Sequence, residues 1–269
     1  MKIQWLGTAA AEGWPAVFCQ CAACREAERR GGRDIRTRSG ALIDGVLLID
    51  ANPDLYHQKL TLGLDLGGVR DIVITHNHSD HFHTMLFWLL NPVAAHRGGA
   101  EPMRIHASAA VLEGIEDAPH YTLHRVEHGE TFAASGYHIT ALPAVHGAPM
   151  SQFFLIERDG AALLYAHDTD LFSDEIWAIL AEAVRAPLGL VSMDCTNGPL
   201  PHSYTGHMGF DDNVTLKDML LERGLADEKT RFVSTHFSHN GRVLYDESVK
   251  RMTPHGIDVA YDGMVITVE

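Results

Sequence analysis

The chain of 269 residues is 46% hydrophobic and 21% charged, the composition of an ordinary globular protein that can bury a sizeable core. Its formal net charge of −14 argues against general nucleic-acid binding, because phosphate backbones are held mainly by clustered Lys and Arg, but leaves small anionic substrates open. No apolar run approaches the roughly 20 residues of a membrane span, and the N-terminus lacks a signal-peptide pattern, so we expect a cytoplasmic protein without a membrane partner.

Short apolar runs alternate with helical patterns along the chain. Strands are predicted at 3–6, 41–43, 46–49, 71–75, 103–106, 138–145, 152–157, 161–166, 189–193, 231–235, 258–261 and 264–268. Helices are predicted at about 80–91, 108–116, 173–184, 208–223 and 243–252. Asp-Gly pairs at 44–45, 159–160 and 262–263 predict hairpin turns. This alternation favours an α/β fold in which two packed sheets are flanked by helices, as one domain over 1–269.

Three of the four cysteines, Cys19, Cys21 and Cys24, lie within six residues near the N-terminus. In a reducing compartment such clustering indicates metal binding rather than disulfides. Three thiolates leave one position of a tetrahedral zinc site open. His239, three residues after His236, is a candidate for that position, and free buried thiols are the alternative.

A histidine-rich run, ITHNHSDHFH, directly follows an apolar strand. His76 and His78 are two residues apart, so on an extended turn they can share one metal ion. Asp80 and His81, at the start of the next predicted helix, would face a second ion. Imidazole and carboxylate suit zinc, manganese, nickel or iron. A solvated loop is the alternative, but this spacing after a strand favours a metal site.

Three further candidate ligands, His146, Asp168 and His236, stand at the ends of predicted strands. The four side chains of the histidine-rich run cannot complete two metal shells, so distant ligands are needed. Strand ends are where a sheet holds loops in fixed positions, so these three residues could reach one site together.

In this order the residues resemble the metallo-β-lactamase fold superfamily, whose HxHxDH signature and later single ligands are all matched. The resemblance implies a four-layer αββα sandwich with two metal ions at one edge. It assigns to the first ion His76, His78 and His146. It assigns to the second ion Asp80, His81 and His236. Asp168 would bridge the ions, and Asp50 would buttress the metal-binding loop, with a simple turn aspartate as the alternative.

The cysteine cluster, the HxHxDH run and the late histidine pair together resemble a subgroup, the cyclic phosphodiesterase of the carbon–phosphorus lyase pathway and its relatives. There the second histidine of the late pair completes a Cys3His structural zinc, which implies that role for His239. The protein B family of pyrroloquinoline quinone biosynthesis shares the cysteine cluster and competes with this interpretation. The complete HxHxDH signature favours the hydrolase over the quinone-biosynthesis family. A homodimer is implied by the resemblance alone.

Protonation of a leaving alkoxide needs an acid, and the loop PLPHSYTGHMGFDD offers two histidines. The resemblance implies that His207 is this general acid, because the relatives carry theirs between an MDC-type strand and the next helix. His202 is the reserve, and a surface loop histidine is the alternative for His207. Asp80 is expected to take part in catalysis as well as in metal binding.

These features predict a metal-dependent hydrolase, in the first place a phosphodiesterase that cleaves a small, cyclic or linear, phosphodiester with a metal-bridging hydroxide. The expected cofactors are two divalent ions in the active site (Zn or Mn, with Ni or Fe as alternatives) and one structural Zn. Thioester or lactone hydrolysis at the same site is one alternative function. A non-catalytic accessory role in quinone-cofactor biosynthesis is the other.

Overall fold

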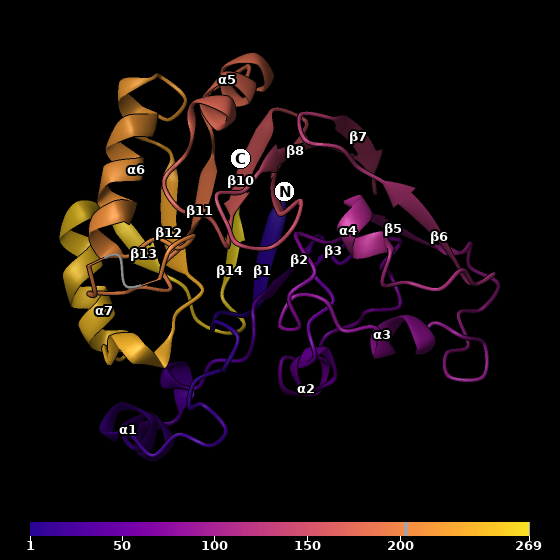
Figure 1. Ribbon diagram of the computed structural model, residues 1–269, viewed down its shortest axis with the longest axis horizontal. Coiled ribbons are helices and arrows are strands. Elements are labelled where there is room, and N and C mark those ends of the chain that lie inside the picture. Colours follow the sequence, from indigo (N-terminus) through magenta and orange to yellow (C-terminus); the bar gives the residue numbers. More distant parts are fainter. Residues whose placement is uncertain (202–203, 269) are drawn as a thin grey trace.

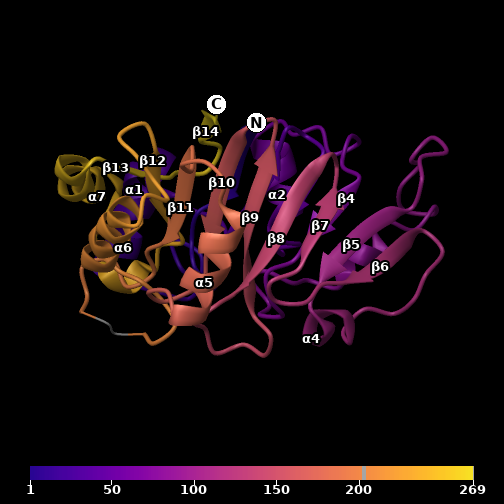
Figure 2. The ribbon, with the colours of Figure 1, turned by 90° about the horizontal axis from the view of Figure 1, so that it is seen from above.

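The computed structural model describes residues 1–201 and 204–268. Two seven-stranded mixed sheets pack face to face, and helices cover both outer faces (Figures 1 and 2). The predicted four-layer αββα sandwich is confirmed.

The first sheet has the order β14-β1-β2-β3-β4-β5-β6. Its strands are β1 (Lys2–Gly7), β2 (Gly40–Ile43), β3 (Leu47–Ile49), β4 (Asp71–Val73), β5 (Met103–Ala107), β6 (Tyr121–Arg125) and β14 (Val265–Thr267). From β3 to β6 neighbouring strands are parallel, so the loops that follow β3 and β4 leave the sheet at the same edge.

The second sheet has the order β13-β12-β11-β10-β9-β8-β7. Its strands are β7 (Thr131–Ala134), β8 (Tyr137–Pro143), β9 (Gln152–Arg158), β10 (Ala161–Ala166), β11 (Leu190–Asp194), β12 (Arg231–Thr235) and β13 (Ile257–Val259). β10 to β13 are parallel, which brings the loops after β10, β11 and β12 together at one edge.

Helices cover the outer face of each sheet. Those on the first sheet are α2 (Leu55–Thr61), α3 (Met85–Trp88) and α4 (Ala109–Leu112). Those on the second are α1 (Ala22–Arg30), α5 (Asp174–Ala183), α6 (Phe210–Glu222) and α7 (Tyr245–Met252). None of the helices in the described part of the chain has the length and apolar character needed to cross a membrane.

Strand β9 shows why its sequence is a continuous apolar run. Phe154 and Ile156 point into the core between the two sheets, whereas Phe153 and Leu155 point into the core beneath the helices. Alternate residues of a strand face opposite sides, so a strand covered on both sides is apolar at every position. Burial of each such side chain stabilises the fold by about 1.5–3 kcal/mol.

Two of the three predicted Asp-Gly hairpins are present, at Asp44-Gly45 between β2 and β3 and at Asp159-Gly160 between β9 and β10. The hairpin predicted at Asp262-Gly263 is wrong. β13 lies in the second sheet, whereas β14 pairs with β1 in the first. The turn crosses between the sheets, and Asp262 is held there by hydrogen bonds from Thr8 and Thr37.

The helix predicted over 80–91 is also wrong in extent, because α3 begins four residues after His81. Asp80 and His81 therefore lie in a turn. The backbone N–H of His81 donates to His78 O (3.0 Å), and His81 O accepts from Ala51 N (2.8 Å). These bonds hold the histidine-rich run against the end of β3 as a loop.

Among the α-helices and strands of the described residues, four were not predicted: α1, α2, β6 and β7. α1 begins after Cys21, whose Sγ accepts a hydrogen bond from Cys24 N (3.4 Å), so a thiol takes the place of the usual N-cap hydroxyl or carboxylate. β6 and β7 occupy the ends of the two sheets, and most of their residues are exposed or half-buried, which leaves no clear apolar alternation.

Candidate metal centre

The histidine-rich loop is held in place by Asp50, which follows β3. Asp50 Oδ1 accepts from Thr75 N (2.8 Å) and Thr75 Oγ1 (3.0 Å), and Asp50 Oδ2 accepts from His81 Nδ1 (2.7 Å). All three residues are fully buried. The structure thus places Asp50 where a buttress of the loop should lie.

His76, His78 and His146 form the first group of ligand atoms, with candidate donor atoms within 4.8 Å of one another. His146 Nδ1 donates to Gly206 O (3.1 Å), which leaves the lone pair on Nε2, 3.1 Å from His78 Nδ1. His76 Nδ1 donates to Thr75 Oγ1 (3.0 Å), whose own proton goes to Asp50. His76 Nε2 is buried and has no hydrogen-bond partner in the structure.

Asp80, His81 and His236 form the second group, and Asp168 lies beside it. Asp168 Oδ2 lies 2.9 Å from His81 Nε2 and 3.2 Å from His236 Nε2. Asp80 Oδ2 lies 3.2 Å from His81 Nε2. Asp168 also shares a set of close ligand atoms with His76 and His81, so it lies between the two groups.

In the second group, the hydrogen bonds of the two histidines place their protons on Nδ1, the ring nitrogen that points away from the other ligands. His81 Nδ1 donates to Asp50, and His236 Nδ1 donates to Thr196 Oγ1 (2.7 Å). Both Nε2 atoms therefore carry lone pairs, yet they face each other at 3.3 Å. Asp168 Oδ2 lies beside them without the geometry of a hydrogen bond. In the neutral rings these lone pairs converge on one point, as they would around a divalent ion.

The charges around this point also require a cation. Burial lowers the pKa of His76 well below its ordinary value. For His81 burial acts in the same direction, but the carboxylates of Asp168, Asp80 and Asp50 outweigh it and raise its pKa well above the ordinary value. With no ion bound, a proton on His81 supplies the positive charge that these buried carboxylates favour, and a divalent ion at Nε2 would take its place.

The backbone is unusual at three of these positions. Asp50, Asp168 and His236 adopt positive φ angles of 66°, 48° and 60°. Side chains other than glycine occupy this left-handed region at a cost of about 1–3 kcal/mol, and they do so mainly at functional sites. His236 directly follows β12 and Asp168 lies two residues after β10, so the positive φ angles turn both ligands toward the centre just beyond the strand ends.

His207 lies beside the second group and pairs with Asp194, the last residue of β11. His207 Nδ1 donates to Asp194 Oδ2 (2.8 Å) and lies 3.7 Å from Asp168 Oδ1. Burial opposes a charge on His207, but Asp194 outweighs it and raises the pKa of His207 to about 9. With no ion bound, this pairing favours the protonated form of His207 at neutral pH. The reserve candidate, His202, lies outside the described residues.

Sequence reasoning missed Asp194. Its Oδ1 accepts from Thr196 N (2.9 Å) and Met208 N (3.1 Å), while its Oδ2 faces His207. The available signal was the one used for Asp168: a carboxylate at the end of an apolar strand. Nothing in the spacing indicates that this second aspartate would hold the histidine rather than a metal.

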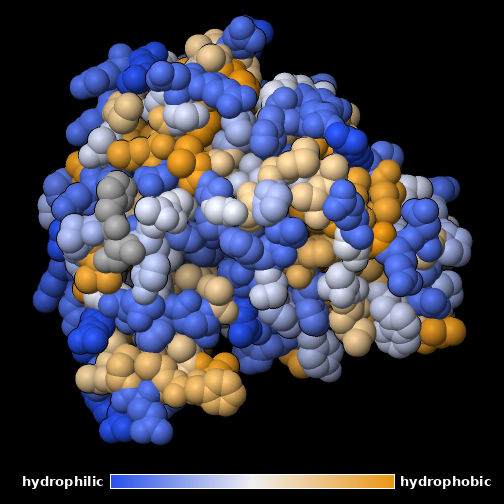
Figure 3. Space-filling view, in the orientation of Figure 1, coloured by the Kyte–Doolittle hydropathy of each residue, from blue (hydrophilic) through white to orange (hydrophobic). Residues whose placement is uncertain are grey.

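Residues of both metal-ligand groups, together with His207, line one cavity of about 470 Å³. Its other lining residues include Glu12, Tyr204, Ser238 and Asn240. Figure 3 shows hydrophilic residues around a hollow near the middle of the face that it draws. The volume suits a small molecule.

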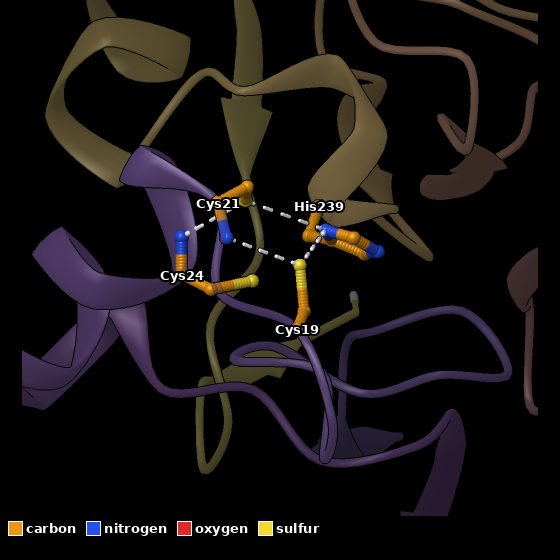
Figure 4. A group of neighbouring side chains, drawn as sticks. All are labelled: Cys19, Cys21, Cys24 and His239. Atoms are coloured by element: carbon orange, nitrogen blue, oxygen red, sulfur yellow. Dashed lines mark hydrogen bonds between the residues drawn. The ribbon is translucent and has the colours of Figure 1, made fainter.

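The predicted cysteine cluster comes together with His239, 218–220 residues away in the chain from Cys21 and Cys19 (Figure 4). His239 Nδ1 lies 3.6 Å from Cys19 Sγ and 3.8 Å from Cys21 Sγ. Burial raises the pKa of Cys24 to about 12; burial has the same tendency at Cys21, but hydrogen bonds from the Cys24 N–H and His239 lower its pKa to about 6. The donor set is that of a closed Cys3His zinc site.

Residues 46–237, well over half of the chain, match the model of the β-lactamase superfamily domain, and the chain therefore belongs to this family. The match includes every candidate ligand of the two groups as well as His207. The cysteine cluster and His239 lie outside it.

The sequence is also similar to individual proteins of different functions. The chain is 26% identical over 316 residues to the coenzyme PQQ synthesis protein B of Cupriavidus necator, covering 99% of both chains. It is 27% identical to the ribonuclease Z of Acaryochloris marina, but over only 42% of this chain and 38% of that one.

Two solved structures resemble the whole molecule. One is a diphosphatase from the PhnP family, with 25% identity, a TM-score of 0.74 and coverage of 99% and 97% of the two chains. The other is Zn(2+)-bound PqqB from Methylobacterium extorquens, with 20% identity, a TM-score of 0.78 and coverage of 99% and 100%. Family, fold and ligand geometry together support a metal-binding member of a hydrolase superfamily.

Proposed function

We propose that the protein is a phosphodiesterase that uses two divalent metal ions to hydrolyse a small phosphodiester. The observation that carries the proposal is the position of His207. Its imidazole lines the same cavity as two adjoining groups of metal ligands, and its Nδ1 donates a hydrogen bond to Asp194. A phosphodiester needs positive charge at its phosphoryl oxygens and a proton for the leaving alkoxide, and this cavity brings both requirements together.

The first ion would be held by His76, His78 and His146. The second would be held by Asp80, His81 and His236, with Asp168 between the two. When bound, such ions polarise the phosphoryl oxygens and lower the pKa of a bound water. His207 then acts as the general acid. Asp194 holds its Nδ1–H, so the ring keeps its orientation and can give a proton to the leaving oxygen.

A second candidate is an accessory protein without hydrolytic activity, in the manner of the coenzyme PQQ synthesis relatives. Its support is the full-length similarity to one of them, with 99% coverage of both chains. A third is hydrolysis of a thioester or lactone on the same ions. A thiolate leaves with less help from an acid than an alkoxide does, so a thioester would leave the pairing of His207 with Asp194 without an evident purpose.

An assay of three substrate classes tests the proposal. Protein loaded with Mn or Zn is given bis-p-nitrophenyl phosphate, a thioester and a lactone at equal concentrations. We expect turnover of the diester above that of the other two, and loss of that turnover after chelation. Faster thioester or lactone turnover would contradict the proposal, and no turnover by fully loaded protein would favour the accessory role.

A further inference from the structure

The cavity of the metal centre is lined by one carboxylate that belongs to neither metal-ligand group, that of Glu12. Glu12 lies in the segment between β1 and the cysteine cluster, and its side chain is 29% exposed. A carboxylate on the wall of a site built for an anionic substrate needs an explanation, since it repels the phosphate that the ions attract.

The residue that hydrogen-bonds Glu12 and several other residues that line the cavity carry uncharged hydrogen-bonding groups. Glu12 Oε1 accepts a hydrogen bond from Ser238 Oγ (2.5 Å), and Asn240 and Thr205 also line the cavity. Among the described lining residues there is no Lys or Arg. Proteins hold phosphate groups outside metal sites mainly with these two side chains. A second phosphate on the part of the substrate beside Glu12 would therefore meet a negative charge, with no Lys or Arg among the described lining residues to offset it.

We propose that Glu12 is a specificity-determining residue of the proposed phosphodiesterase. It accepts a hydrogen bond from a hydroxyl group on the half of the substrate that does not react, and it disfavours substrates that carry a second phosphate on that half. The inference rests on the proposed function. A carboxylate has several acceptor positions, so the bond from Ser238 leaves others for a substrate hydroxyl. Repulsion of a like charge is a usual way to exclude a wrong ligand.

Glu12 also lies near the cysteine cluster, which offers a competing role. Glu12 Oε1 is 3.7 Å from His239 Nε2, on the side of the ring that faces away from the sulfur atoms. Its task could then be only to orient that histidine. The two roles differ in their results: a purely structural residue affects all substrates equally and affects zinc content, whereas a specificity residue changes the ratio between two substrates.

Two chromogenic diesters that differ by one phosphate separate these roles. They are thymidine 5′-(p-nitrophenyl phosphate) and the same compound with a 3′-phosphate, both of which release p-nitrophenol. We expect metal-loaded wild-type protein to favour the first by about tenfold or more in kcat/KM. Glu12→Gln should bring the two values closer together, and Glu12→Lys should favour the 3′-phosphorylated diester. The change should come mainly through KM of that diester.

The matched control is Glu113→Gln, at an exposed position at the end of α4, which should leave the ratio unchanged. Equal ratios in wild type and Glu12→Gln overturn the inference, as does an equal loss on both diesters together with loss of zinc. Wild-type turnover of bis-p-nitrophenyl phosphate without turnover of either thymidine diester also overturns it, while the proposed function stands. Failure of loaded wild-type protein on all three diesters removes both.

Discussion

At the scale of single residues, some of the side chains that would act on substrate or metal are held by others that do not. Asp50 holds His81, and Asp194 holds His207. Such outer partners fix both the orientation of an imidazole and the nitrogen that carries its proton. The histidines were visible in the sequence because of their spacing. Asp194 was not, because its role depends on a contact with a residue 13 positions further along the chain.

His207→Ala should lower kcat on a diester with an alkoxide leaving group by about 10²–10⁴, the usual range for loss of general acid or base help, while metal content stays unchanged. Turnover of bis-p-nitrophenyl phosphate should fall less, because p-nitrophenolate leaves without a proton. Asp194→Asn should give part of this loss, because the imidazole keeps its place but no longer faces a charge. His128→Ala, at an exposed position, is the control and should have wild-type kcat. Unaltered turnover in His207→Ala would remove this residue from the mechanism.

Asp71 should make stability depend on pH. It is fully buried and accepts hydrogen bonds from Arg104, His106 and Ser135 at 2.6–2.8 Å. Burial tends to raise its pKa, but these donors outweigh it and hold the pKa well below the ordinary value. A carboxyl group with a depressed pKa stabilises the fold above its unfolded pKa of about 3.9, and this contribution is lost as pH falls further.

Asp71→Asn should therefore lower the free energy of unfolding by about 2–3 kcal/mol at pH 7. Denaturant titrations should show this difference shrinking as the pH is lowered below about 4. The control is Asp258→Asn in the exposed pair with Arg231, which should change stability by less than about 1 kcal/mol at either pH. A difference for Asp71→Asn that is the same at both pH values would be inconsistent with this account.

At the scale of elements, one buried side chain determines how the segment after β11 reaches the cavity. Asn197 Nδ2 donates to Tyr204 O (3.1 Å) and His207 O (2.8 Å), and its Oδ1 accepts from Tyr204 N (2.9 Å). The backbone N–H of Asn197 donates to Met208 O (2.9 Å). Asn197 thus joins the start of the segment to the part that carries His207.

Asn197→Asp should lower kcat by about tenfold or more, because it replaces a donor to two carbonyl groups by a carboxylate oxygen that repels them. Metal content should remain at the wild-type value. Asn91→Asp is the matched control: the Asn91 Oδ1 accepts from Val93 N (3.1 Å), as a carboxylate also can. Wild-type kcat in Asn197→Asp would show that His207 is positioned by other contacts.

Elements were predictable from the sequence where local pattern and tertiary surroundings agree. The buried strands β8 to β12 have apolar runs, and the residues that follow β8, β10 and β12 were recognised as candidate ligands from this pattern alone. The pairing partner of β14 was not predictable, since an Asp-Gly turn serves a hairpin and a crossing between sheets equally well. α3 was predicted too long because helical periodicity continues through the loop, where backbone bonds to Ala51 decide otherwise.

At the scale of the whole molecule, the cysteine cluster joins the N-terminal region to the segment after β12. We expect about three metal ions per chain by elemental analysis, one of them a zinc that resists chelation. Cys21→Ser should remove that zinc and lower the melting temperature, because a closed structural site contributes directly to folding. Cys195→Ser, a buried cysteine outside the cluster, should keep all three. Full zinc content in Cys21→Ser would rule out the assignment.

The two metal-ligand groups draw on both sheets, since the histidine-rich loop follows a strand of the first and the other three ligands follow strands of the second. Bound ions would therefore cross-link the two sheets, which otherwise pack against each other through apolar side chains. Loading with metal should slow amide hydrogen exchange in β4 and β12 together, although these strands share no hydrogen bond. Local unfolding of one sheet near the site would then require the ions to dissociate from the ligands of the other sheet.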